Sequence, residues 1–135
     1  MDPLLSRKDF EVQVLKLLRG KCCLCSAPAT AAHHILDRKL FADGGYRLSN
    51  GAPVCDACHW RCETTEVSVE DVRKACGHNA LVLPDGFEPA LTYDKWGNLI
   101  QPDGFRIPGP LAEDTGTIKA LTKGGVYWKL LRHQS

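Results

Sequence analysis

Two pairs of cysteines constrain how this 135-residue chain can fold. Cys22 and Cys25 form one Cys-x2-Cys pair, and Cys55 and Cys58 form a second. Two-residue spacing lets both thiolates of a pair reach one ion at about 2.3 Å, and four sulfurs close a tetrahedral zinc site. The pattern therefore predicts a structural zinc ion, which would add stability to the small core of a short chain.

Three cysteines lie outside these pairs: Cys23, Cys62 and Cys76. An odd total of seven is typical of metal ligands and spare thiols in a reducing compartment, not of disulfides. Cys23 could replace Cys22 as a ligand, but a single residue would then separate the ligands of the first pair. We expect the three extra cysteines to be buried or partly exposed thiols.

Charge and hydropathy describe an ordinary soluble protein. The formal net charge of +1 predicts neither acidic nor basic partners. Residues 16–61 hold seven lysines and arginines against three acidic residues. This local excess suits a polyanion, although a solvated basic face has the same composition. The chain shows no secretory signal and no apolar run of roughly 20 residues, so we expect a cytoplasmic protein with no membrane partner.

The periodicity of apolar residues predicts a helix over residues 6–19. Ser6 can cap it, with Asp9 as a capping-box partner, and Gly20 suits its C-terminal end. One face of this helix carries Phe10, Val14, Leu17 and Leu18.

The middle of the chain predicts a strand and two helices. Residues 31–36 are short and apolar apart from two histidines, which favours a strand, and residues 51–54 lead into a helix that begins near Cys55. Ser68 and Gly77 bound a further helix whose inward face carries Val69, Val72 and Ala75.

The character of the chain changes after Gly77. Residues 84–110 are rich in proline and glycine, and Pro-Asp-Gly-Phe occurs at 84–87 and again at 102–105. Residues 93–99 have the pattern of a hairpin turn. We expect an irregular, β-rich arm, followed by a helix over 115–132 that Gly124 and Gly125 interrupt.

The 29 residues between the cysteine pairs carry the chemistry-bearing side chains. His33 and His34 are adjacent, 15 residues lie between His34 and Asn50, and His59 adjoins the second cysteine pair. This order of histidine pair, asparagine and histidine, interleaved with two Cys-x2-Cys pairs, resembles the HNH (ββα-metal) endonuclease family over residues 22–63.

The resemblance implies a role for each of these residues. Hydrolysis of a phosphodiester needs a water molecule that loses a proton and positive charge near the phosphate. His34 would be the general base, because a neutral imidazole can accept that proton. His33 would face the metal, since neighbours on a strand point to opposite sides. Asn50 would orient the His34 loop through its amide.

His59 and Glu63 are four residues apart on the predicted helix and share one face. Many family members place a histidine where this chain has Glu63. Two interpretations of Glu63 are open: it is the third ligand, or it is an acidic residue on the helix surface. A His33, His59 and Glu63 shell with water positions suits Mg²⁺ or Mn²⁺. Cys62 is the alternative ligand, but it lies off that face, and His59 alone could be an extra zinc ligand.

A looser resemblance extends to residues 34–46 and 93–98. These runs are similar to phage and bacterial HNH proteins found beside or fused to RNA-ligase-like nucleotidyltransferases. The resemblance implies nucleic-acid processing in a bacterial or phage-infected cell, with the C-terminal arm docking a protein partner or the substrate. Tyr93 and Trp96 would then stack on bases, or else pack as a hairpin pair within their own domain. The candidates for phosphate contact, each also readable as a solvated charge, are Arg38, Lys39, Arg47 and Arg61.

The expected fold is α+β: an N-terminal helix and a zinc-stapled ββα-metal nuclease core in residues 1–76, then a C-terminal arm in residues 77–135. The expected function is metal-dependent cleavage of nucleic acid, with DNA the expected substrate and 5′-phosphate and 3′-hydroxyl ends as products. The alternative is a non-catalytic, zinc-organised module that binds nucleic acid or acts as an adaptor, in which the histidines are structural.

Overall fold

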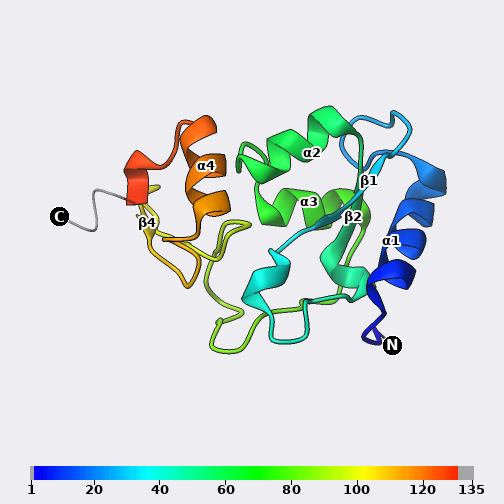
Figure 1. Cartoon of the computed structure of the whole chain (residues 1–135), viewed down its shortest axis with the longest axis horizontal. Helices are drawn as coiled ribbons and strands as arrows, with labels where there is room; N and C mark the ends of the chain where they lie inside the picture. Colours follow the sequence, from blue (N-terminus) through cyan, green and yellow to red (C-terminus); the bar gives the residue numbers. More distant parts are fainter. Residues whose placement is uncertain (1, 131–135) are drawn as a thin grey trace.

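A two-stranded antiparallel sheet lies at the centre of the N-terminal half of the computed structural model, which describes residues 2–130. β1 (Ala31–His34) pairs with β2 (Gly51–Val54) so that His33 lies opposite Ala52 and His34 opposite Gly51. α1 (Arg7–Lys16) covers one face of this sheet, and α2 (Asp56–Glu63) and α3 (Val69–Cys76) cover the other (Figure 1). The mixture of helices and small sheets confirms the α+β prediction at this level.

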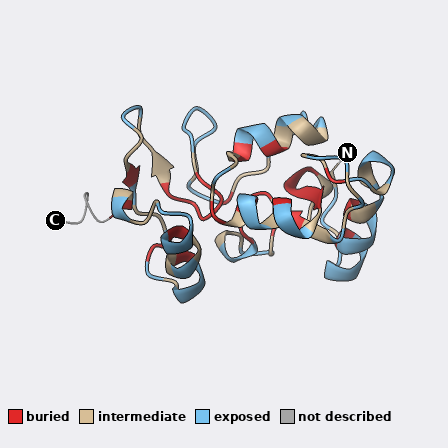
Figure 2. Ribbon diagram, turned by 90° about the horizontal axis from the view of Figure 1, so that it is seen from above, coloured by how far each residue is buried: buried red, intermediate tan, exposed pale blue. Residues whose placement is uncertain are grey.

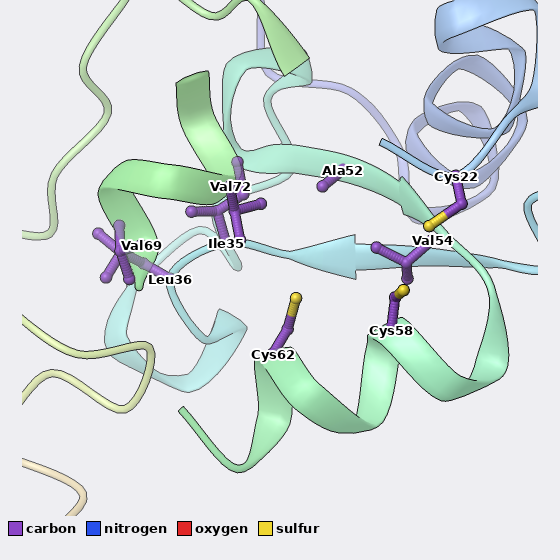
Figure 3. Close-up of a cluster of buried hydrophobic side chains, with 9 residues drawn as sticks. All are labelled: Cys22, Ile35, Leu36, Ala52, Val54, Cys58, Cys62, Val69 and Val72. Carbon is purple, nitrogen blue, oxygen red and sulfur yellow. The ribbon is translucent and has the colours of Figure 1, made fainter. Parts of the chain in front are cut away.

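The main core fills the space between the sheet and the helices α2 and α3. Ala52 and Val54 point from β2 toward this core, where they meet the side chains of Cys58 and Val72 (Figure 3). Buried residues concentrate where these elements meet, while the outer faces of the helices are exposed (Figure 2). Each fully buried aliphatic side chain of this kind contributes about 1.5–3 kcal/mol to folding.

α1 packs closely on β2 because residue 51 is a glycine. A side-chain carbon at Gly51 would collide with Val14 and press on Phe10. The helix begins where the sequence predicts, since the Ser6 hydroxyl accepts a hydrogen bond of 3.0 Å from the Asp9 amide.

The predicted extent of the helix over residues 6–19 is wrong at its C-terminal end. α1 stops at Lys16 and a 3₁₀ turn follows over Leu17–Gly20, with Leu18 and Arg19 in the left-handed region. Leu18 is 42% exposed, so it does not extend the buried face. The chain leaves the helix because the next residues must form a turn in which the Cys22 amide donates to the Ala27 carbonyl.

The other predictions for the N-terminal half differ in accuracy. Both predicted starts of helices, one after Cys55 and one after Ser68, are confirmed. The predicted end of α3 at Gly77 is also confirmed, and this glycine is left-handed at φ +71°. The strand predicted over 31–36 ends at His34. Residues 51–54, which the sequence places only as the approach to a helix, form β2, with Pro53 opposite Ala32.

The segment after residue 77 contains less strand than the sequence predicts. Its described part has two strands of two residues each, β3 (Leu99–Ile100) and β4 (Arg106–Ile107), then α4 (Thr115–Lys123) and a helical segment over residues 128–130. The helix predicted over 115–132 is interrupted at Gly124 and Gly125, as the sequence predicts, and its residues 131–132 lie outside the described residues.

Buried polar contacts take the place of a larger sheet in this arm. The Asp94 carboxylate accepts hydrogen bonds from the amides of Trp96 and Asn98 and pairs with Arg106 at 2.9 Å. The turn predicted over 93–99 is confirmed, because the Asp94 amide donates to the Asn98 carbonyl. Among the described residues, no helix has the length and apolar character needed to cross a membrane.

Candidate functional site

The four cysteines of the two Cys-x2-Cys pairs come together in space. The sulfurs of Cys22, Cys25, Cys55 and Cys58 all lie within 4.8 Å of one another. The Sγ atoms of Cys25 and Cys55 are 3.6 Å apart. Sulfurs that bind one tetrahedral zinc ion at about 2.3 Å lie roughly 3.8 Å from one another, so the observed distance is close to that of a zinc site. The cluster can therefore hold one metal ion, and its all-thiolate composition is consistent with zinc.

A short turn and the start of a helix position these sulfurs. The Cys22–Cys25 pair lies on a tight loop closed by the Lys21–Pro28 bridge, and the Cys23 amide donates to the Pro53 carbonyl, which fastens the loop to β2. Cys55 immediately precedes α2, so Cys58 points back toward the loop (Figure 3). Burial alone would raise the pKa of the Cys22 thiol. Hydrogen bonds from the amides of Cys55, Leu24 and Cys25 outweigh this effect and lower the pKa to about 6, which favours the thiolate.

The remaining cysteines lie outside this cluster. Cys62 is buried in the core between α2 and the sheet, away from the ligand face of the helix. Cys23 lies beside Cys76, and the hydrogen bond between their side chains is the main reason why the pKa of Cys23 is lowered. Cys22, and not Cys23, therefore belongs to the four-sulfur set.

A second group of potential ligands forms on the opposite end of α2. One ligand atom each from His33, His59 and Glu63 lies within 4.8 Å of the others. β1 directs His33 toward α2, where its ring lies 5.2 Å from that of His59. His59 and Glu63 are one helical turn apart, with 3.0 Å between Nε2 and Oε1. The residues predicted to bind a catalytic cation are thus brought together, while that role stays a prediction.

The protonation of this group suits a hard divalent cation. Burial, aided by the positive charge of Lys95, lowers the pKa of His33 well below its usual value, so the imidazole is neutral. Its Nδ1 is buried with no hydrogen-bond partner among residues 2–130. Burial raises the pKa of Glu63, but its contacts with His59 and Lys95 lower it to about 2. The group offers neutral nitrogen and anionic oxygen, the states in which imidazole and carboxylate bind a divalent cation.

His34 points to the other side of β1, against α1. Its ring stacks on Phe10 at 4.6 Å and meets Tyr46 edge-on at 5.2 Å. The side chain is half-buried and lines a pocket of about 350 Å³ between α1 and β1. Its Nε2 is buried and has no hydrogen-bond partner in the described part of the chain.

The pKa of His34 has a measurable consequence for stability. Burial, followed by the charge of Lys95, lowers this pKa to about 4, whereas an unfolded histidine titrates near about 6.5. Because the unfolded state binds the proton first, the free energy of unfolding should fall as the pH drops from about 6.5 to about 4. We expect His34→Gln to reduce the loss of stability between pH 7 and pH 5 by about 1 to 2 kcal/mol. Urea denaturation at both pH values checks this, and an unaltered pH dependence in the variant contradicts it.

Asn50 fixes the loop that follows His34. The asparagine is 1% exposed, its Oδ1 accepts from the Leu36 amide at 3.0 Å, and its Nδ2 donates to the carbonyls of Leu36 and Gly45. The Ile35 amide donates to the Asn50 carbonyl. This is the placement that the predicted orienting role requires.

Asn50→Ala should lower the free energy of unfolding by about 2–4 kcal/mol, because the buried amide and carbonyl of Leu36 would lose their partner and the Gly45 carbonyl would keep only the Arg47 amide. Asn79→Ala, which alters an exposed asparagine, should change stability by no more than about 0.5 kcal/mol. Equal effects in the two variants, measured by urea denaturation, would show that Asn50 does not hold the loop.

Sequence reasoning missed Lys95, which reaches the candidate site from the arm. Lys95 is 5% exposed, and its Nζ lies 2.6 Å from Asp37 Oδ1 and 3.2 Å from Glu63 Oε2. The Asp37 amide donates to the Lys95 carbonyl, and the Trp96 indole donates to the Glu63 carbonyl. Lys95 therefore supplies buried positive charge beside both histidines. A lone lysine in a turn gave no sequence signal of this placement.

The structure separates the candidates for phosphate contact. Lys39 pairs with Asp114, Arg47 with Asp43 and Arg61 with Glu66. Arg38 is exposed, has no ion pair among residues 2–130, and lines the same pocket as His34.

Of the two alternatives for Trp96, the structure has packing within its own domain and not stacking on bases. Trp96 is 8% exposed and packs with Leu121 and Leu130. Tyr93 does not pair with it; its ring instead lies 4.3 Å from that of Phe87. Trp96 is thus part of the core of the arm, which the tight turn at Gly97 brings against the end of α2.

The arrangement combines a four-cysteine cluster that can hold a metal ion with a second ligand group, and His34 leaves β1 on the side opposite to that group. The two are built from consecutive elements, β1, β2 and α2, and the arm closes over the second group through Lys95. Comparisons of this chain with protein families, with curated proteins and with solved structures give no match.

Proposed function

We propose that this chain is a metal-dependent endonuclease of the HNH (ββα-metal) type. The observation that carries the proposal is the convergence of one ligand atom each from His33, His59 and Glu63 within 4.8 Å of one another, while His34 leaves the same strand on its opposite side. The succession of β1, β2 and α2, with Asn50 holding the loop between the strands, supports the same assignment.

Each side chain has a chemical task in this proposal. His34 accepts a proton from the water molecule whose oxygen attacks phosphorus, and the bond from phosphorus to the 3′ oxygen breaks. His33, His59 and Glu63 would hold one divalent cation, which supplies positive charge to the phosphate and the leaving oxygen. The products carry 5′-phosphate and 3′-hydroxyl ends.

The two histidines leave β1 on opposite sides, which restricts where the phosphate can lie. Among the described residues β1 pairs only with β2, so its other edge is unpaired. His34 is the last residue of the strand, and Lys95 influences the pKa of both histidines. The phosphate would therefore lie across the end of β1, where it can meet both sides of the strand.

The four-cysteine cluster has a separate, structural role in the proposal. It fastens the loop that precedes β1 to the start of α2, so it sets the distance between the element that carries His33 and the element that carries His59. Four thiolates leave no open position for a substrate or water.

Cleavage of plasmid DNA, oligonucleotide duplexes, single strands and RNA with Mg²⁺ or Mn²⁺ tests the proposal. We expect cleavage that EDTA stops and excess Mg²⁺ restores, since this restoration separates an exchangeable cation from the structural site. The 5′ ends should be ligatable without kinase treatment. Binding without cleavage on every substrate and with either metal would favour the non-catalytic adaptor instead.

A further inference from the structure

The pocket beside His34 has a wall that the cleavage chemistry does not use. This pocket, which we name the α1 pocket, lies between α1 and β1 and measures about 350 Å³. Arg7 and Glu11 reach it from α1, Arg38 reaches it from the turn after β1, and His34 lies in its wall. The alanines at 31 and 32 line the strand side, and their short side chains leave this side open.

The charges of the α1 pocket favour an anion. Arg7 and Arg38 come from different elements, both are exposed, and neither has an ion pair among residues 2–130. Three other basic candidates each have an acidic partner: Lys39, Arg47 and Arg61. Glu11 is the only acidic residue that lines the pocket, and it lies one helical turn from Arg7 without an ion pair to it.

The other polar groups of the pocket leave the two arginines as its available donors. The Thr30 hydroxyl already donates to the Asp56 carboxylate at 2.6 Å. Guanidinium groups match the geometry of phosphate oxygens and can bind them through two parallel hydrogen bonds.

We propose that the α1 pocket holds a backbone phosphate of the substrate strand, next to the phosphate that is cleaved, with Arg7 and Arg38 as its contacts. This inference rests on the proposed function and adds the path of the substrate to it. The nucleic-acid strand crosses the end of β1. One phosphate meets His34 and the ligands on the α2 side, and the neighbouring phosphate is held on the α1 side. Contacts of this kind position a nucleic acid and do not read its sequence.

Fluorescence anisotropy with a labelled DNA duplex and its single strand, in buffer without added Mg²⁺ or Mn²⁺, tests the pocket apart from cleavage. Arg7→Ala and Arg38→Ala should each weaken binding about 3- to 10-fold at low salt, and each should reduce the salt dependence by about one counterion. Glu11→Gln should tighten binding about 2-fold, because it removes the one negative charge of the wall. The matched control is Lys8→Ala, which removes an exposed cation from the same helix at a position outside the pocket.

The outcomes separate this inference from the proposed function. Losses confined to the two arginine variants, with a gain in Glu11→Gln, support the pocket even if the wild-type protein cuts nothing. Unaltered binding in Arg7→Ala and Arg38→Ala, or a loss in Lys8→Ala of the same size, overturns the pocket even if the wild-type protein cuts DNA. Circular dichroism and zinc content of each variant show that the fold is retained.

Discussion

Replacing His34 with alanine is expected to slow metal-dependent cleavage by about 10²–10⁴-fold, the usual contribution of a general base. The variant loses the imidazole to which the proposed mechanism assigns the proton of the attacking water. His33, His59 and Glu63 remain in place on β1 and α2, so Mn²⁺ binding should be nearly unaffected. Single-turnover cleavage rates at saturating protein measure the effect on the chemical step.

His78→Ala is the matched control for this prediction. His78 follows α3, and its Nε2 forms a hydrogen bond of 2.7 Å with the Gly51 carbonyl, but it belongs to neither ligand group. Its loss should affect stability and leave the single-turnover rate within a few-fold of wild type. A His34→Ala protein that cuts within tenfold of wild type, or a His78→Ala protein that is equally slow, contradicts the assignment of the base.

Removing one thiolate of the four-cysteine cluster is expected to abolish cooperative folding. Cys55→Ser deprives the cluster of a ligand, and zinc in such sites supplies about 10–16 kcal/mol of apparent folding free energy. This is as large as the whole stability of about 5–15 kcal/mol that a small domain usually has. Thermal unfolding followed by circular dichroism, with zinc content by mass spectrometry, gives the result.

Cys23→Ser separates the loss of a ligand from the loss of any thiol. Cys23 is half-buried and adjacent to Cys22, yet it lies outside the four-sulfur set. This variant should keep one zinc per chain and melt within several degrees of wild type. If Cys55→Ser melts like wild type, or if both variants lose zinc to the same extent, the cluster does not staple the fold.

The parts of the site that follow from short-range pattern could be predicted from the sequence. Two-residue spacing places the cysteines of each pair on one turn, and a spacing of four places His59 and Glu63 on one helical face. Alternation along a strand sends His33 and His34 to opposite sides, as the structure has them. These relations depend on local geometry, so they hold whatever the rest of the chain does.

Contacts between distant segments could not be predicted in the same way. Lys95 lies 58 residues from Asp37 in sequence, and only the docking of the arm brings their charges together. Arg7 reaches the α1 pocket because a glycine at 51 lets α1 approach β2 closely. Neither relation leaves a periodic pattern in the sequence.

Errors in the predicted elements have the same origin. Leu17 and Leu18 continue the helical period of α1. The loop closed by the Lys21–Pro28 bridge follows at once, so the chain must turn before it reaches Lys21. Pro53 and Gly51 disfavour a strand by composition, yet β2 forms because its residues are buried between α1 on one face and α2 and α3 on the other. In both places tertiary packing overrides local preference.

Anomalous diffraction from crystals grown with Mn²⁺ tests the central claim most directly. Data at the manganese and zinc absorption edges should show one manganese peak among His33, His59 and Glu63, and one zinc peak among the sulfurs of the four-cysteine cluster. An absence of manganese at the first position, with the three side chains turned away from one another, would contradict the proposed catalytic centre and leave a zinc-folded scaffold.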